Sequence, residues 1–356
     1  MGILASHERK ENGLKLLVTG GAGFIGSNFI RLALTTRRDI HIVNFDKLTY
    51  AGNPESLSDL ASDPRYDLVR GDISDSAAVS HVFKRGFDAL VNFAAETHVD
   101  RSIEDALPFL RTNILGAQCL LEAARDTKLA RFVHISTDEV YGSAPAGHSF
   151  TEETILDPRS PYAASKASAD HFVTAYANTY GVSAIILRCT NNYGPFQFPE
   201  KLIPLIIANA QEDKTLPIYG DGMQERDWLF VEDYCRAILL ALEKGKTGQI
   251  YNVSAGTPQP NLEIVKTILE GLGKPESLLQ YVQDRPGHDR RYALDSSKIR
   301  RELGWRPEVS FADGIRRTID WYRSNSSWLE HARSGEYRNY YDRHYTNRSE
   351  TFSRSK

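Results

Sequence analysis

In the first half of the chain, short apolar runs alternate with stretches of helical periodicity. The apolar runs lie at residues 15–20, 40–46, 66–73, 89–95, 131–137 and 183–189. They are almost continuously apolar, which is typical of strands that are buried on both faces of a sheet. Helical patterns separate them, at residues 24–36, 76–85, 105–126 and 161–179. Repeated βα units of this kind predict an α/β fold with a doubly wound parallel sheet and right-handed crossovers.

The pattern changes after about residue 190, where proline, glycine and aromatic residues cluster between further helical stretches. These stretches lie at residues 201–211, 232–243, 261–272 and 311–323. We therefore predict an N-terminal tail at residues 1–13, the doubly wound domain at 14–190 with a segment returning near 228–255, a smaller mixed α/β lobe at 191–325, and a C-terminal tail at 326–356. The lobe would cover the carboxyl edge of the sheet, where open α/β folds bind ligands.

The composition narrows the possible partners and compartments. The chain has 356 residues, 41% of them hydrophobic and 25% charged, with a formal net charge of −3. This ordinary balance points neither to nucleic acid nor to an anionic membrane as a partner. No apolar run approaches the ~20 residues that a membrane helix needs. The N-terminus becomes charged too early for a secretory signal, although it fits the loose M-G-x-x-x-S pattern of N-myristoylation; the alternative is a plain tail.

Cys119, Cys189 and Cys235 lie far apart and form no C-x-x-C pair. We therefore expect no disulfide framework and no metal site, and a reducing compartment such as the cytoplasm.

A glycine-rich turn follows the first predicted strand directly. Either Gly21 or Gly20 can begin a spaced set that continues with Gly23 and Gly26. Glycines here permit a tight turn and let backbone N–H groups approach a pyrophosphate at the start of the next helix. Asp46 ends the second strand, 20 residues after Gly26, where a carboxylate can bind ribose hydroxyls and repel a 2′-phosphate. The pattern predicts a Rossmann-type domain for NAD rather than NADP; the alternative is a strand-end turn with a solvated aspartate.

Candidate catalytic residues follow the fifth strand and open the next helix. Tyr162 and Lys166 are four residues apart, so on a helix they share one face. A free tyrosine has a pKa of ~10, and a nearby ammonium group would favour its phenolate. Thr137 could then hydrogen-bond the oxygen of a substrate hydroxyl that Tyr162 deprotonates. Thr137 is followed by the adjacent acids Asp138 and Glu139. The alternatives are a buried tyrosine beside a solvated lysine, and acids in a helix-capping turn.

Several long motifs carry a resemblance to a known family. They include TGGAGFIGS, NFAAETHVDRSI, STDEVYG, SPYAASK, TNNYGPFQFPEKLIP and DRPGHDRRYALD. Over roughly residues 14–325 the chain resembles the extended short-chain dehydrogenase/reductase family, in its branch of sugar-nucleotide dehydratases. The resemblance implies NAD as cofactor, dTDP-glucose as substrate and a homodimer formed through helices near 105–126 and 161–179. It also implies C4 oxidation, loss of water from C5 and C6, and C6 reduction, with Glu139 as base and Asp138 as acid.

The resemblance implies two further sets of binding residues. The expected cofactor-binding residues are Gly20, Gly23, Phe24, Ile25, Gly26, Asp46, Lys47, Leu48, Thr49, Asp72, Ile73, Phe93, Ala94, Ala95, Thr97, Thr112, Tyr162, Lys166 and Asn192. The expected substrate-binding residues are Thr97, Thr137, Asn191, Lys201, Leu202, Pro217, Ile218, Tyr219, Arg226, Asn261, Arg285 and His288. Arg290 and Arg291 are expected on a solvated basic face, and His288 could equally be structural.

Three other functions remain open. A sugar-nucleotide epimerase or decarboxylase could use the same scaffold, but would not need the pair Asp138 and Glu139. A dehydratase could instead act on UDP-glucose. The base of UDP-glucose lacks the methyl group of thymine, and a contact with that methyl group is worth only ~1 kcal/mol. A non-enzymatic NAD-binding sensor could keep the glycine turn, but the presence of Thr137, Tyr162 and Lys166 argues against it. The pathway that would use the product, such as rhamnose synthesis or another deoxysugar route, is not indicated.

Overall fold

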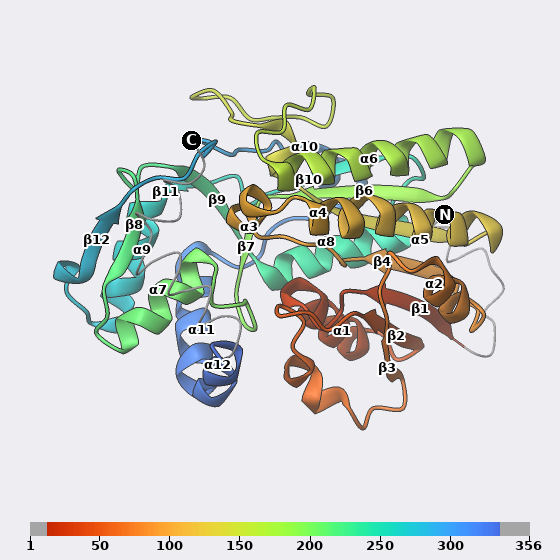
Figure 1. Cartoon of the computed structure of the whole chain (residues 1–356), viewed down its shortest axis with the longest axis horizontal. Helices are drawn as coiled ribbons and strands as arrows, with labels where there is room; N and C mark the ends of the chain where they lie inside the picture. The colour runs from red at the N-terminus through yellow and green to blue at the C-terminus, as the bar shows by residue number, and fades with distance from the viewer. Residues whose placement is uncertain (1–12, 335–356) are drawn as a thin grey trace.

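The computed structural model describes residues 13–334 of the chain (Figure 1). The myristoylation pattern, nearly all of the predicted N-terminal tail and most of the predicted C-terminal tail lie outside these residues. Within residues 13–334, no helix is long and apolar enough to cross a membrane.

A seven-stranded sheet, parallel throughout, forms the larger part of the molecule. Its strands are β1 (Leu14–Thr19), β2 (Ile40–Asp46), β3 (Tyr66–Arg70), β4 (Ala89–Asn92), β5 (Arg131–Thr137), β6 (Ala184–Cys189) and β10 (Ile250–Val253). Their spatial order is β10-β6-β5-β4-β1-β2-β3, so the chain direction across the sheet reverses between β1 and β4. This order confirms the predicted doubly wound sheet. In such sheets, ligands bind at the point where the strand order reverses, beyond the carboxyl ends of the strands.

Helices cover both faces of this sheet (Figure 1). One face packs against α1 (Phe24–Thr36), α8 (Val231–Lys244) and α10 (Ser297–Leu303), and the other against α2 (Ser76–Phe83), α5 (Ala117–Asp126) and α6 (Pro161–Tyr180). Successive side chains of β1 alternate between the two cores: Leu16 and Val18 belong to the first and Leu17 to the second. Since strands are buried on both faces, their sequences are nearly continuous in apolar residues.

A smaller lobe has its own core and its own short strands. Its helices are α7 (Leu202–Gln211), α9 (Asn261–Leu272), α11 (Phe311–Ser324) and α12 (Ser326–Ala332). Its strands are β7 (Asn191–Tyr193), β8 (Leu216–Tyr219), β9 (Glu225–Phe230), β11 (Pro258–Pro260) and β12 (Leu279–Val282). They form a mixed sheet of order β11-β9-β7 and a parallel pair of β12 with β8. The lobe stands beside one end of the large sheet in Figure 1, at the left.

Four segments differ from the sequence-based expectation. The helix expected at residues 105–126 is divided into α4 (Leu107–Phe109), a π-helical stretch η3 (Leu110–Gly116) and α5. A short helix α3 (Val99–Glu104) was not expected, nor was α10, which joins the core of the large sheet. Residues 326–332, expected to begin a surface tail, form α12 instead, because Trp328 and Leu329 are buried in the core of the smaller lobe.

Candidate active site

The glycine-rich turn joins β1 to α1 at the carboxyl edge of the sheet. Gly20 has a φ of +71°, and a Cβ there would lie 2.5 Å from the backbone nitrogen of Ala94. A Cβ on Gly26 would lie 2.5 Å from the carbonyl oxygen of Gly20. Gly21 instead packs toward the side chain of Asn44, whose oxygen accepts a hydrogen bond from its N–H at 2.9 Å. Of the two spaced sets, the one containing Gly20 therefore faces the cavity.

Asp46 closes β2 opposite this turn. Its carboxylate accepts hydrogen bonds from the N–H of Ala22 at 2.9 Å and of Leu48 at 2.8 Å. Burial raises the pKa of Asp46, and these backbone hydrogen bonds oppose that shift. Leu48 was predicted to bind the cofactor, but it is not among the residues that line the cavity; its backbone, at φ +58°, serves to hold Asp46.

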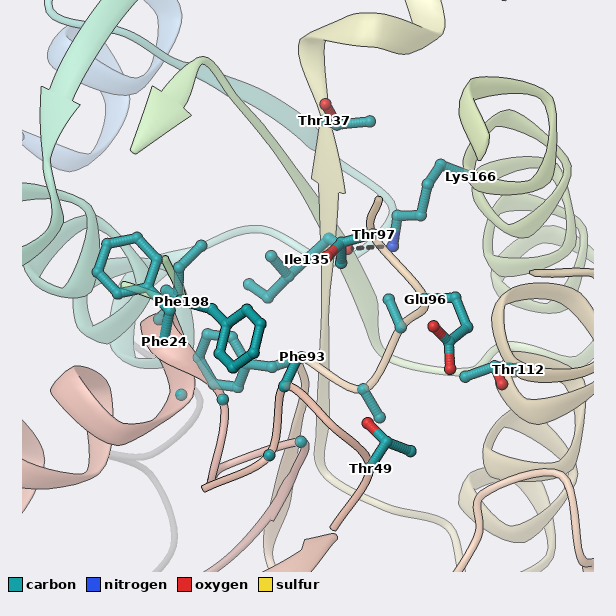
Figure 2. Close-up of a pocket in the computed structure, with 18 of the residues that line it drawn as sticks. Phe24, Thr49, Phe93, Glu96, Thr97, Thr112, Ile135, Thr137, Lys166 and Phe198 are labelled. Atoms are coloured by element: carbon teal, nitrogen blue, oxygen red, sulfur yellow. Dashed lines mark hydrogen bonds between the residues drawn. The ribbon is translucent and has the colours of Figure 1, made fainter. Parts of the chain in front are cut away.

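A cavity of about 300 Å³ opens beside the turn (Figure 2). It is lined by every other residue of the predicted cofactor set: Gly20, Gly23, Phe24, Ile25, Gly26, Asp46, Lys47, Thr49, Asp72, Ile73, Phe93, Ala94, Ala95, Thr97, Thr112, Tyr162, Lys166 and Asn192. The π-helical stretch places Thr112 on this wall and Asn113 behind it. The side chain of Asn113 bonds the backbone of Glu96 and the hydroxyl of Ser165. The cavity thus has the glycine cradle, strand-end carboxylate and apolar walls that suit a dinucleotide.

The two adjacent acids lie in a single 3₁₀ turn that begins where β5 ends. Thr137 is the N-cap of this turn, and its hydroxyl oxygen accepts the N–H of Glu139 at 3.3 Å. The same hydroxyl donates to Asp138 at 3.1 Å. The capping turn considered as an alternative is therefore real, but it also directs Asp138 and Glu139 to the cavity, which both of them line.

The environments of the two acids differ. Burial, reinforced by the charge of Glu139, raises the pKa of Asp138 well above its usual value. Burial also raises the pKa of Glu139, but Arg285 and Arg226 oppose the shift. Asp138 is the more deeply buried of the two, and one of its carboxyl oxygens has no hydrogen-bond partner. Burial thus favours the neutral form of both acids, and more strongly for Asp138; a difference of this kind can give neighbouring carboxyl groups different roles.

Tyr162 and Lys166 open α6 and reach the same cavity from the side. The ammonium of Lys166 donates to the carbonyl oxygen of Ile135 at 2.6 Å (Figure 2). Burial lowers the pKa of Lys166 to about 8. Burial raises the pKa of Tyr162 well above its usual value, and the charge of Glu139 adds to this, whereas a hydrogen bond with Thr137 opposes it. The structure brings all five predicted catalytic residues to one cavity. Tyr162 and Lys166 are both buried, so the alternative of a solvated lysine does not hold.

A second cavity, of about 190 Å³, continues from the first into the smaller lobe. Apart from Thr137, which lines the first cavity, the predicted substrate residues line it: Thr97, Asn191, Lys201, Leu202, Pro217, Ile218, Tyr219, Arg226, Asn261, Arg285 and His288. Glu139, Thr97 and Lys201 line both cavities, so they mark the point where the two meet.

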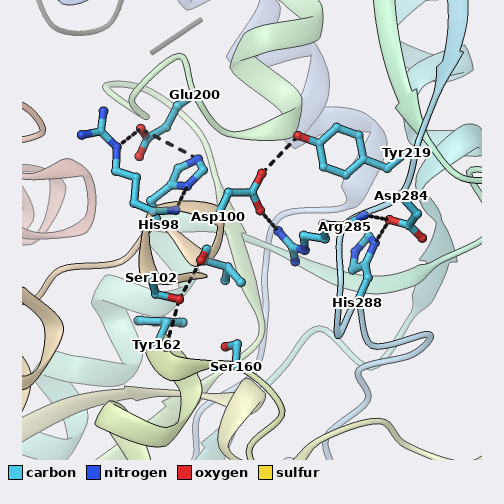
Figure 3. A network of polar contacts seen from close by, with 12 residues as sticks. His98, Asp100, Ser102, Ser160, Tyr162, Glu200, Tyr219, Asp284, Arg285 and His288 are labelled. Carbon is cyan, nitrogen blue, oxygen red and sulfur yellow. Dashed lines mark hydrogen bonds and ion pairs between the residues drawn. The ribbon is translucent and has the colours of Figure 1, made fainter. Parts of the chain in front are cut away.

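A polar network surrounds this junction (Figure 3). Asp100 is buried and pairs with Arg285 at 3.1 Å, and it accepts the hydroxyl of Tyr219 at 3.3 Å. His288 contacts Asp284 at 2.7 Å, and burial together with Arg285 lowers the pKa of His288 to about 4. Arginine side chains in a cavity of this kind suit a diphosphate, because a guanidinium pairs with two oxygens at once.

Several buried polar atoms in these cavities have no protein partner. They include the side-chain oxygens of Asn191, Asn192 and Asn261, one oxygen of Asp138 and Nε of Arg285. Buried polar groups are nearly always hydrogen-bonded, so a set of unpaired ones around a cavity indicates a polar ligand. The residues present therefore fit a dinucleotide in the first cavity and an anionic, hydroxyl-rich ligand in the second.

Sequence reasoning missed part of the lining. Glu96 and Phe198 line the cofactor cavity, and Gln197 and Glu200 line both cavities. Burial raises the pKa of Glu200 to about 7, against the opposing charges of neighbouring cations. The signal available for Glu200 was its place directly before Lys201 in a quoted motif.

The expectation for Arg291 was wrong. Its guanidinium is largely buried, and it bonds Glu225 at 2.9 Å and the carbonyl oxygen of Pro145 at 3.0 Å. The tertiary packing of the loop that contains Pro145 covers it. Arg290 is exposed, as expected, and pairs with Asp221.

Comparison with known proteins agrees with this geometry. The family model described as GDP-mannose 4,6 dehydratase matches residues 17–318. A dTDP-glucose 4,6-dehydratase of Shigella flexneri is 49% identical over 94% of this chain and 100% of its own. The crystal structure of DesIV, a dTDP-glucose 4,6-dehydratase from Streptomyces venezuelae solved with NAD bound, has a TM-score of 0.87 at 50% identity, covering 90% of this chain and 100% of that one.

Epimerases of the same architecture are more distant. A UDP-glucose 4-epimerase of Thermus thermophilus, solved with NAD, has a TM-score of 0.81 at 33% identity, covering 88% of this chain and 100% of that one. The acid pair and the relatives at about 50% identity both indicate a dehydratase rather than an epimerase. The chain belongs to the GDP-mannose 4,6 dehydratase family, in its branch of dTDP-glucose 4,6-dehydratases.

Proposed function

We propose that this protein converts dTDP-glucose to dTDP-4-keto-6-deoxyglucose with NAD as a recycled cofactor. The observation that carries the proposal is the meeting of two sets of groups in one place. The redox residues Tyr162 and Lys166 and the acid pair Asp138 and Glu139 line one cavity, where the cofactor and substrate pockets join.

The residues act in sequence on one hexose. Thr137 orients the C4 hydroxyl, and Tyr162 takes its proton, with Lys166 lowering the cost of the phenolate. NAD⁺, when bound, supplies the acceptor for the C4 hydride and later the donor of a hydride to C6. The C4 ketone acidifies the proton on C5, which Glu139 removes. Asp138 protonates the C6 hydroxyl, which leaves as water, and a proton returns to C5 at the end of the cycle.

The nucleotide would occupy the second cavity. Arg226 and Arg285 would pair with the diphosphate, and Asn191 and Thr97 would contact the sugar end. Pro217 to Tyr219 and Leu202 would form the wall against the base. The choice of thymine rests on the relatives, which are named for dTDP-glucose.

We also propose that the protein works as a homodimer. The support is a set of large apolar side chains on α4, η3 and α6 that are 40–50% exposed: Leu107, Leu110, Leu115 and Phe172. Exposed apolar side chains that gather on one face are typical of protein interfaces. The three cysteines are free and buried, and free thiols suit a reducing compartment, so we propose a cytoplasmic location.

The decisive experiment follows a deuterium atom placed on C4 of dTDP-glucose. A closed redox cycle in one pocket should deliver that deuterium to C6 of the same molecule, which mass spectrometry and NMR of the product methyl group would detect. Mixing labelled and unlabelled substrate checks that the transfer stays within one molecule. An epimerase would return the label to C4, and deuterium released to free NADH would contradict the proposal. The same assay with UDP-glucose tests the choice of base.

A further inference from the structure

The helix α12 joins the two parts of the molecule at a place remote from the catalytic residues. It lies beyond residue 318, where the match to the family model ends. Its Trp328 is buried in the core of the smaller lobe, with ring centroids 5.2 Å from Trp321, 5.9 Å from Phe196 and 6.4 Å from Tyr322. This aromatic cluster fixes α12 firmly against its own lobe.

The same helix also holds the NAD-side domain. The indole N–H of Trp328 donates to the hydroxyl oxygen of Ser56 at 3.1 Å, and both side chains are buried. One turn further, His331 pairs with Glu55 at 2.9 Å on the surface. Ser56 and Glu55 belong to the 3₁₀ helix Pro54–Leu60, which lies in the connection between β2 and β3. A single helix of the smaller lobe therefore anchors this connection.

The anchor is closed into a ring by α1. Arg31 donates to the carbonyl oxygen of Ser56 at 2.6 Å, and its guanidinium lies 4.4 Å from the ring centroid of Phe196. Phe196 has a φ of +65°, a conformation that a bulky residue keeps only where its surroundings hold it. Ser56, Arg31, Phe196 and Trp328 thus hold one another in a cycle that crosses the boundary between the two parts.

The anchored connection is also a wall of the cofactor cavity. Lys47, Thr49, Ala51 and Gly52 line the cavity from this connection, and Phe198 lines it from the smaller lobe (Figure 2). The rings of Tyr50 and Phe198 meet edge to face at 5.6 Å. A ligand in this cavity would be enclosed between two segments, residues 47–60 and 196–201. Trp328 contacts the first segment through Ser56 and the second through Phe196.

We propose that α12 is a latch that retains the cofactor, and that the hydrogen bond from Trp328 to Ser56 is its holding contact. The inference rests on the proposed use of NAD. A cycle that regenerates its cofactor gains nothing from releasing it, so a fixed wall favours turnover. Trp328 does not touch the reacting atoms; it positions the wall, and its effect should fall on release of NAD rather than on the chemical steps.

The test compares the holoenzyme with two variants that remove one side of the holding contact. Trp328→Phe keeps an aromatic ring but removes the N–H donor, and Ser56→Ala removes the acceptor. Each enzyme is loaded with NAD and diluted, and the NAD still bound is measured by chromatography over time. We expect release to be about fivefold faster in each variant, equivalent to about 1 kcal/mol for one buried hydrogen bond. The double variant should be no faster than the singles, because the two side chains share one contact.

Trp321→Phe is the matched control. Trp321 packs in the same aromatic cluster, at 4.5 Å from the ring of Phe196, but among residues 13–334 its indole nitrogen has no hydrogen-bond partner. It should release NAD at the wild-type rate. Equal acceleration by Trp321→Phe would show a general loosening and overturn the latch, as would wild-type release rates in both test variants.

Thermal unfolding of each variant checks that the fold is intact. If Trp328→Phe fails to fold, Ser56→Ala alone decides the question. A wild-type protein that cannot be loaded with NAD at all would overturn the proposed function together with the latch. A wild-type protein that holds NAD, with variants that hold it equally well, would overturn only the latch.

Discussion

At the scale of residues, two carboxyl groups of similar chemistry differ in pKa shift because their surroundings differ. Asp138 and Glu139 are neighbours in the chain, yet burial and the charge of Glu139 push the pKa of Asp138 far upward. Arg285 opposes the upward shift of the pKa of Glu139, and Arg226 opposes it in both acids. The larger upward shift favours the proton on Asp138 over the proton on Glu139, which matches the acid and the base that elimination needs.

Replacing Glu139 with Gln should separate the steps of the reaction. The variant keeps the side-chain shape but cannot accept the C5 proton, so C4 oxidation should proceed while elimination slows at least 10²-fold. Single-turnover experiments should show absorbance at 340 nm that rises and persists, with little 6-deoxy product. Glu152→Gln is a control outside both cavities. Normal product formation by the Glu139 variant would show that another group is the base.

At the scale of elements, the junction of β1 and α1 illustrates two different demands on glycine. Gly26 lies inside α1 against the turn, where a Cβ would meet the backbone of Gly20 and Gly21 at 2.5 and 2.7 Å. Gly23 lies at the N-cap and faces the cavity, where a Cβ would meet only the carbonyl oxygen of Gly20 at 3.3 Å. Gly26 allows α1 to pack closely against the turn, and Gly23 leaves room for a ligand.

Alanine substitutions should separate these roles. Gly26→Ala should lower the free energy of unfolding by about 1–3 kcal/mol, because backbone atoms must move apart. Gly23→Ala should change stability by no more than about 0.5 kcal/mol but weaken NAD binding, because its methyl group enters the cavity. Thermal unfolding and NAD titration measure the two quantities. Equal losses of stability in both variants would contradict this division.

At the scale of the whole molecule, the large sheet and the smaller lobe meet around two adjoining cavities. The large sheet supplies the glycine turn, the acid pair and α6. The smaller lobe supplies side chains that close the second cavity, among them Leu202, Tyr219 and Arg285. In Figure 1, α4 and α6 lie away from the core of the smaller lobe. The exposed apolar side chains Leu107, Leu110, Leu115 and Phe172 belong to α4, η3 and α6. A dimer formed through this face, as proposed above, would leave the active site open to substrate.

Charged residues on that face should disrupt the proposed dimer. Leu110→Glu combined with Phe172→Glu would bury two carboxylates in an apolar interface, so the protein should elute as a monomer in size-exclusion chromatography with light scattering. Ile155→Glu is the control, because Ile155 is 87% exposed on a different segment. A wild-type monomer, or a double variant that stays dimeric, would contradict the proposed interface.

The sequence by itself determined the parallel sheet and most of the catalytic set. Continuous apolar runs predict buried strands, and carboxyl ends of parallel strands meet at one edge, so Gly20, Asp46 and Thr137 had to lie near one another. The spacing of Tyr162 and Lys166 placed both on one face of a helix. These features depend on residues close together in the chain, or on the general geometry of βα units.

Only the tertiary structure decided the rest, because it depends on contacts between distant segments. The burial of Arg291 by the loop around Pro145 and the place of Glu200 at the junction of both cavities have no local pattern. The helix α12 looked like part of a polar tail, since its stability comes from the burial of Trp328 and Leu329 against partners far away in the sequence. Short helices are marginal alone and form where packing favours them, which local periodicity cannot reveal.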